Sequence, residues 1–171
     1  NLGVKLKSQT NRLRHLRHKH RRKNRYATQG RFVGYFRASK RGSTFFEAKK
    51  YCSRKYGGLA SINSNHENEQ VKRVCSVILG DERQNGYYCW IGLFKPWQQW
   101  LNNRKVDWQK WASNQKHMTE TGKYRGKHKC VGIYKSTGFW YHQRCGYRNG
   151  AICEKPHGKY VGDYIVVQKQ Y

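Results

Sequence analysis

The sequence predicts an α+β domain held together by disulfides, and three observations support this class. Two amphipathic helical patterns occupy the stretch from about residue 43 to 79, and short runs rich in aromatic and β-branched residues follow them. Six cysteines in a chain of 171 residues indicate disulfides formed in an oxidising compartment. Because no two of these cysteines form a C-x-x-C pair, the pattern does not support a zinc or thioredoxin-like motif.

The expected first elements are a short strand at residues 32–36 and a helix that begins near residue 45. Ser43 is the expected N-cap of this helix, and the Gly-Gly pair at residues 57 and 58 ends it. Residues 59–62 predict a short apolar strand, and residues 67–79 predict a second helix. The apolar stripe of the second helix contains Val71, Val74, Val77 and Ile78.

The second half of the chain is rich in predicted strands. Residues 87–93 (YYCWIGL) predict a buried strand of aromatic and branched side chains. A long polar segment rich in tryptophan follows at residues 95–129. Three short strands then complete the pattern, at 130–134 (CVGIY), 139–141 (FWY) and 151–153 (AIC).

Positive charge is spread over the whole chain, which divides into a basic arm (1–30), a domain (31–155) and a C-terminal extension (156–171). The chain has 36 Lys and Arg against nine Asp and Glu, a formal net charge of +27. The arm contains ten Lys and Arg and few aliphatic residues, so we expect it to be disordered alone. Without the arm, 26 basic residues still face nine acidic ones, which indicates a polyanionic partner for the domain as well.

The expected polyanion-binding residues lie in the arm and in the long polar segment. They are Arg12, Arg14, Arg17, Lys19, Arg21, Arg22, Lys23, Arg25, Lys95, Arg104 and Lys116.

Five motifs occur in a fixed order along residues 31–155. They are STFFEAKKYCSRKYGGLASI from Ser43, WIGL from Trp90, CVGIY from Cys130, GFWYHQRC ending at Cys145, and AICEK around Cys153. This run resembles the C-type-lectin-like domain family. The resemblance implies an α+β fold with two helices, small antiparallel sheets and a long loop region, stapled by disulfides.

The resemblance also implies two disulfides, Cys52–Cys153 and Cys130–Cys145. The first closes a loop of about 100 residues, a constraint that stabilises the fold by roughly 4–5 kcal/mol in the chain-entropy description. Cys75 and Cys89 remain, at the end of the second helix and the start of the WIGL strand, where a local bridge is easy. A bridge between two chains is the alternative.

Sugar-binding members of this family hold calcium with oxygen ligands from three places, and this sequence departs from the family at all three. The Glu-Pro-Asn or Gln-Pro-Asp motif of the long loop is replaced by Gln-Lys-His at residues 115–117. The acidic residue that the family has just before its third core cysteine is replaced by His128. The family's Trp-Asn-Asp motif is replaced by Trp-Tyr-His at residues 140–142. Calcium takes about 6–8 oxygen ligands, usually including carboxylates. We therefore expect no calcium and no calcium-dependent sugar binding.

Three histidines stand at the positions from which the calcium ligands are missing: His117, His128 and His142. We expect no cofactor, but three imidazoles are also a zinc or copper ligand set, or a pH-dependent anion site. The chain has eight histidines, three of them in the arm, so anion affinity should rise as the pH falls from about 7.5 to about 5.5 and they become charged.

The tryptophans of the long polar segment allow two interpretations. In the first, Trp97 and Trp100 form an exposed aromatic–basic surface with the neighbouring Lys95 and Arg104. In the second, the two tryptophans are part of the core.

The sequence does not predict an enzyme. His66-Glu67 begins like the zinc motif H-E-x-x-H, but residue 70 is Gln, and no other catalytic motif or pair of carboxylates is present. No run of about 18 apolar residues predicts a transmembrane helix. The chain begins at Asn1 without an apolar leader, so we expect a processed, secreted, extracellular protein.

The leading functional hypothesis is therefore calcium-independent binding of anionic polymers such as sulfated glycosaminoglycans and acidic or mineral-associated matrix proteins. The resemblance implies two alternatives, because very basic domains of this kind include mineralised-tissue matrix proteins and cytotoxic granule proteins. One is a cationic host-defence protein that acts on anionic membranes. The other is a structural component of an extracellular assembly. Nucleic acid is not the expected partner of a secreted fold, although the charge alone would allow it.

Overall fold

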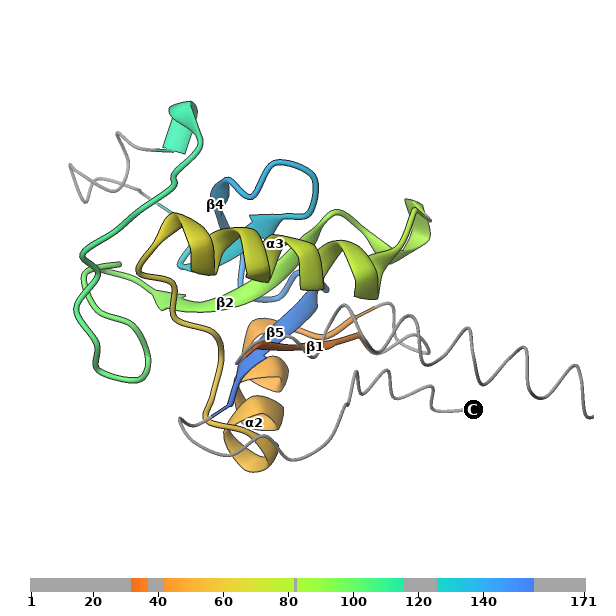
Figure 1. Ribbon diagram of the computed structural model, residues 1–171, viewed down its shortest axis with the longest axis horizontal. Helices are drawn as coiled ribbons and strands as arrows, with labels where there is room; N and C mark the ends of the chain where they lie inside the picture. The colour runs from red at the N-terminus through yellow and green to blue at the C-terminus, as the bar shows by residue number, and fades with distance from the viewer. Residues whose placement is uncertain (1–31, 37–41, 82, 116–125, 156–171) are drawn as a thin grey trace, which may run out of the picture.

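One five-stranded sheet and two helices form the folded domain (Figure 1). The computed structural model describes residues 32–36, 42–81, 83–115 and 126–155, so the arm and the C-terminal extension lie outside the described residues. No helix in this described part is long and apolar enough to cross a membrane. The elements are β1 (Phe32–Tyr35), α2 (Phe45–Lys55), α3 (Asn65–Leu79), the short 3-10 helix η2 (Arg83–Asn85), β2 (Tyr88–Phe94), β3 (Cys130–Tyr134), β4 (Trp140–Gln143) and β5 (Gly150–Glu154).

The N-cap of helix α2 lies one residue later than the sequence suggested. It is Thr44, whose side chain accepts a hydrogen bond of 3.3 Å from the backbone N–H of Glu47. The prediction of Ser43 as the cap is wrong, because the backbone of Ser43 pairs with that of Asn149. The N–H of Ser43 donates to the Asn149 carbonyl at 2.9 Å, and the N–H of Asn149 donates to the Ser43 carbonyl at 3.0 Å. This pairing fixes the start of α2 against the segment that leads into β5.

The helix α3 begins two residues before the expected position and is capped by Ser64. The Ser64 hydroxyl accepts from the backbone N–H of Glu67 at 3.1 Å, and the Glu67 carboxylate accepts from the backbone N–H of Asn63 at 2.8 Å. This reciprocal arrangement satisfies two N–H groups at the helix start. Of the predicted apolar stripe, Val71, Val74 and Ile78 are buried and Val77 is half-buried.

The sheet has the strand order β1-β5-β2-β3-β4 and is mixed, because β2 and β5 are parallel while the other neighbouring strands are antiparallel. Residues 59–62, expected as a strand, form only an isolated bridge from Leu59 to Cys153. The backbone of Ala60 still donates to the Ile152 carbonyl at 2.9 Å, so this segment lies along the sheet without forming a strand of its own.

The core is packed on both faces of the sheet. On the α3 side, Ile78 and Leu79 belong to a buried cluster with Ile91 and Val131. On the α2 side, Phe45 belongs to a second buried cluster with Trp90, Ala151 and both cysteines of one disulfide. Figure 1 shows α3 lying across the sheet and α2 lying beside its β1–β5 end.

Three disulfides connect these layers, and they join the pairs that the sequence suggested. Cys52–Cys153 ties α2 to β5, Cys75–Cys89 ties α3 to β2, and Cys130–Cys145 ties β3 to the end of β4. Their Cα–Cα distances of 5.2, 5.9 and 5.2 Å are ordinary for disulfides. Because all six cysteines are paired within the chain, Cys75 and Cys89 form the local bridge rather than a bridge between chains.

Candidate functional site

The segment after β2 folds back on the sheet as a small hairpin. Gln99 and Lys105 form an isolated bridge, and the backbone N–H of Trp100 donates to the Arg104 carbonyl at 2.9 Å. The turn places Asn103 at a φ of 69°, a left-handed conformation that asparagine tolerates better than most residues. The hairpin is anchored to β2 because the backbone N–H of Leu101 donates to the Gly92 carbonyl at 2.9 Å.

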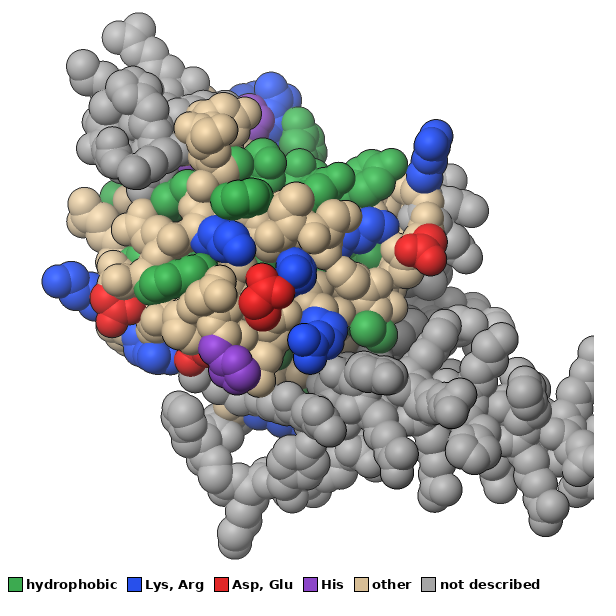
Figure 2. All heavy atoms as spheres, turned by 45° about the horizontal axis from the view of Figure 1, so that its top comes forward, with side chains coloured by type: hydrophobic (Ala, Val, Ile, Leu, Met, Phe, Trp, Pro, Cys, Tyr) green, Lys and Arg blue, Asp and Glu red, His purple; other side chains and the backbone are tan. Residues whose placement is uncertain are grey.

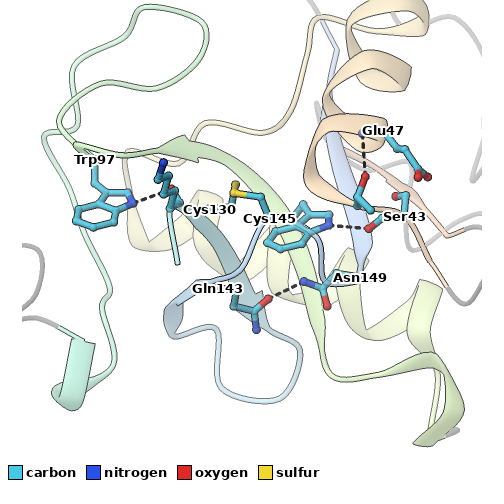
Figure 3. Close-up of a disulfide and its surroundings, with 10 residues drawn as sticks. Ser43, Glu47, Trp97, Cys130, Gln143, Cys145 and Asn149 are labelled. Carbon is cyan, nitrogen blue, oxygen red and sulfur yellow. Dashed lines mark hydrogen bonds between the residues drawn. A yellow bond between two sulfur atoms is a disulfide. The ribbon is translucent and has the colours of Figure 1, made fainter. Parts of the chain in front are cut away.

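Trp97 and Trp100 lie in the core, so the interpretation of these tryptophans as an exposed aromatic–basic surface is wrong. Each side chain is only 2% exposed. The Trp97 indole donates to the carbonyl of Lys129 at 3.2 Å, just before Cys130 (Figure 3), and the Trp100 indole donates to Asn63 Oδ1 at 3.1 Å. These buried rings hold the long loop against β3 and the start of α3.

A groove of about 830 Å³ lies along this folded loop. Its rim includes the two lysines 95 and 105, and the Lys95 amine lies 6.0 Å from the centre of the Trp97 ring. Amide side chains also line it, from Gln98, Gln99 and Gln109. A groove with ammonium and amide donors suits an anionic, hydroxyl-bearing ligand.

The predicted site residue Arg104 lies beside this groove but points to other partners. Its guanidinium Nη1 donates to Ser61 Oγ at 3.3 Å, while the side chain as a whole stays exposed. Ser61 in turn donates to the Glu154 carboxylate at 2.9 Å, and Asn102 donates to the same carboxylate at 3.2 Å. Arg104 therefore braces the hairpin as well as adding charge to the surface.

Gln115 and His142, two of the residues at which the sequence departs from the family's calcium motifs, pack with two tryptophans. We call this group the loop cluster: Trp97, Trp111, Gln115 and His142. The His142 ring stacks on Trp111 at a centroid distance of 4.2 Å and 6° between planes, and meets the Trp97 ring edge-on at 4.2 Å. Gln115 Oε1 accepts from the backbone N–H of His142 at 2.9 Å and lies 2.9 Å from its ring Nδ1. Because a carbonyl oxygen only accepts, Nδ1 carries the proton and donates it.

A family comparison agrees with this fold. Residues 41–155 match the Lectin C-type domain family. The chain belongs to the C-type lectin domain family. Rat E-selectin (Rattus norvegicus) is 29% identical over 132 residues, which cover 70% of this chain but 21% of the selectin. This C-type lectin domain chain therefore spans about a fifth of the length of the selectins it matches.

Two further relatives are similar over a larger share of their own length. One chain of a snaclec coagulation factor IX/factor X-binding protein from Gloydius halys is 29% identical over 116 residues, covering 65% of this chain and 70% of that protein. The carbohydrate-recognition domain of the mouse scavenger receptor C-type lectin has a similar structure. Its TM-score is 0.53 at 27% identity, and the match covers 74% of this chain and 92% of the mouse domain.

In this C-type lectin domain, the loop cluster keeps His142 neutral. Burial, with a smaller contribution from the nearby His128, lowers the pKa of His142 from 6.5 to about 4. Burial and the charge of Arg144 also lower the pKa of His128. The expectation that these histidines become charged between about pH 7.5 and 5.5 is therefore wrong for His142.

The zinc or copper alternative stays untested, because His117 lies outside the described residues. Within them, no three His, Cys, Asp or Glu side chains group closely enough to hold a metal ion. Gln115 and His142 bond to each other, and His128 lies near Tyr147 at a ring-centroid distance of 6.5 Å. His117 and Lys116 lie outside the described residues, as do the predicted arginines and lysines of the arm.

The few carboxylates of the domain serve mainly its own structure. Glu69 lies 2.7 Å from Lys72 and 3.8 Å from Lys110, and the hydrogen bond from Lys72 lowers the pKa of Glu69. Glu47 lies 3.8 Å from Arg148. Nine carboxylates cannot neutralise 36 Lys and Arg side chains in any arrangement, so the surface keeps a large positive excess.

One basic surface was not among the predicted site residues. The exposed surface of α2 has four cations, Lys49, Lys50, Arg54 and Lys55, all outside the buried stripe of the helix. Lys55 also lies 5.3 Å from the centre of the Tyr51 ring. The sequence signal was available, because two basic pairs stand on the polar side of a predicted helix.

Proposed function

We propose that this C-type lectin domain binds anionic polymers outside the cell without calcium, and that sulfated glycosaminoglycans are the main class. The observation that carries this proposal is the charge excess of the chain, +27 overall. The excess is present on the folded domain and not only on the arm, because α2 alone exposes four cations. Such a surface attracts a polymer of closely spaced sulfates or carboxylates and releases its condensed counterions.

Calcium independence is supported by the loop cluster. The amide of Gln115 and the imidazole of His142 are bonded to each other where the family presents oxygen ligands. His142 is only 6% exposed, and no carboxylate replaces the missing ligands at residues 115, 128 or 142. Calcium prefers several oxygen ligands with negative charge, so this arrangement disfavours it.

An extracellular location is supported by the three disulfides, which persist in oxidising compartments. The snaclec that resembles this chain is named as a coagulation factor IX/factor X-binding protein, and the scavenger receptor domain is named for carbohydrate recognition. For this chain, we infer the same general role, binding rather than catalysis, with a polyanion as the ligand.

The test is the heparin affinity of the full chain at salt concentrations from about 0.1 to 0.4 M. Affinity should fall by orders of magnitude over this range, as for a protein that contacts on the order of 6–10 anionic groups. Calcium and a chelator should give the same values. Uncharged dextran, the control, should not bind. A salt-insensitive affinity contradicts the proposal, and leakage of anionic liposomes without heparin binding favours the host-defence alternative.

A further inference from the structure

Three tyrosines lie together on one face of the sheet, and we call them the tyrosine platform: Tyr88, Tyr134 and Tyr141. Tyr88 on β2 is directly opposite Tyr134 on β3, and Tyr141 on β4 is opposite Gly132 on β3. Because alternate residues of a strand point to the same side, the three side chains share one face. Their ring centroids are 5.3, 5.5 and 6.2 Å apart, so each ring contacts both others.

A glycine in the middle of this face keeps the platform continuous. A Cβ atom at Gly132 would lie 3.3 Å from the Tyr88 Cβ and 3.0 Å from Gln143 Oε1. With no side chain at this position of β3, the rings of Tyr88 and Tyr141 approach each other from the two neighbouring strands. The result is a three-strand aromatic surface rather than separate side chains.

The helices leave this surface partly open. On the same face of β2, Trp90 is fully buried by α2, with its ring 5.6 Å from that of Phe45. On the opposite face, Cys89 is bonded to Cys75 of α3. The platform tyrosines lie beyond the part covered by α2 and remain partly exposed. Figure 2 shows a band of hydrophobic side chains along the upper part of the described surface.

A fixed cation stands at the edge of the platform. Tyr87 is 41% exposed, and its ring lies 6.2 Å from that of Tyr134. The Lys135 amine lies 5.3 Å from the centre of the Tyr87 ring and donates to the Gly80 carbonyl at 2.7 Å. Its charge is therefore held beside Tyr87, which is the neighbour of the platform, instead of moving freely in solvent.

We propose that the tyrosine platform binds the sugar rings of an anionic glycan and that Lys135 pairs with a sulfate or carboxylate of the same chain. Aromatic rings offer flat apolar contact to the C–H face of a sugar, and tyrosine adds a hydroxyl for hydrogen bonding. A second copy of this chain is a poor occupant, because each copy has a net charge of +27. This inference rests on the proposed function and names the part of the ligand that the charges alone do not recognise.

The experiment compares two anionic polymers, heparin, which has sugar rings, and inorganic polyphosphate, which has none. The full-length double variant Tyr134→Ser/Tyr141→Ser is titrated with a heparin octasaccharide and with inorganic polyphosphate of similar charge. Loss of two ring contacts should weaken heparin binding by about tenfold and change polyphosphate binding by less than about twofold. The matched control is Tyr147→Ser, which removes a tyrosine 48% exposed but outside the platform and should leave both affinities unchanged.

A second measurement avoids any folding defect of the variants. On the wild-type chain, heparin should protect Tyr87, Tyr88, Tyr134 and Tyr141 from chemical nitration, as mapped by mass spectrometry, whereas polyphosphate should protect them less.

The inference is overturned if the double variant binds heparin like the wild type, or if it loses heparin and polyphosphate equally while remaining folded. It is also overturned if the variant loses affinity for a single-stranded oligonucleotide but not for heparin, since the platform would then stack bases. In each of these results the wild type still binds polyanions, so the proposed function stands. Failure of the wild type to bind either polymer would instead remove the proposed function.

Discussion

Tyr141 and His142 are neighbours on β4, yet they belong to opposite kinds of surface. His142 is buried in the loop cluster, between the rings of Trp97 and Trp111 and bonded to Gln115. Tyr141 projects to the other face of the sheet and lies partly exposed in the tyrosine platform. The comparison teaches that aromatic packing encloses the side chain on one face of β4, while part of the other face of the sheet is left open.

The largest expected effect is on the stability of the loop cluster. Trp97→Ala removes a side chain that is 2% exposed, together with its hydrogen bond to the Lys129 carbonyl. The free energy of unfolding should fall by about 3–5 kcal/mol, measured by urea denaturation with the disulfides intact. Tyr147→Ser is the control. A loss below about 1 kcal/mol would mean that Trp97 does not support the closed loop.

The second prediction concerns the pH dependence of stability. The unfolded chain takes up a proton at His142 below about pH 6.5, but the folded chain does so only near its pKa of about 4. The free energy of unfolding should therefore fall as the pH drops through this window, by on the order of 2–3 kcal/mol from this residue. His142→Phe, which keeps a ring between the tryptophans, should flatten the slope, measured by denaturation across pH.

The exposed histidine of α3 provides the control for this measurement. His66→Gln should keep the wild-type slope. An unchanged slope in His142→Phe would show that the loop cluster does not hold a neutral imidazole.

The third prediction concerns the open side of the comparison. Tyr141→Ser removes a partly exposed ring that contacts the rings of its platform neighbours. The free energy of unfolding should fall by less than about 1.5 kcal/mol, well below the effect of Trp97→Ala. If both changes destabilise equally, the platform is part of the core and the contrast between the two faces disappears.

The smallest expected effect is that of calcium. Thermal unfolding with calcium and with a chelator should give midpoints that agree within about 1 °C, because a ligand stabilises only the protein that binds it. A rise of several degrees in the unfolding midpoint with calcium would show that the chain binds calcium, and would contradict the proposed calcium independence.

The helices and most of the strands could be predicted from the sequence because their signals are local. Short runs of apolar side chains, typical of buried strands, occur at residues 87–93 and 130–134. Apolar residues at helical spacing occur at residues 67–79. The family resemblance supplied two disulfides, Cys52–Cys153 and Cys130–Cys145. The third was expected because Cys75 ends a predicted helix and Cys89 begins the next predicted strand. The cap of α2 moved by one residue because Ser43 pairs with Asn149, more than 100 residues later in the chain.

The candidate sites depended on contacts between distant residues, and the sequence predicted them less well. Tyr88, Tyr134 and Tyr141 come together only through the β2–β3–β4 register. Trp97 and Trp100 are buried by a hairpin in a polar segment, where composition favours exposure as much as burial. The neutral state of His142 needed its stacking partners to be known.

The central claim, that polyanion binding is shared between the basic arm and the folded domain, is tested most directly by heparin affinity across salt for the full chain and for a chain lacking residues 1–30. The arm contributes ten Lys and Arg, but the rest of the chain keeps 26 basic against nine acidic residues. The shorter chain should bind more weakly and with a flatter salt dependence, and it should still bind. Complete loss of binding would assign the function to the arm alone, and affinity that does not change with salt in either chain would contradict the account.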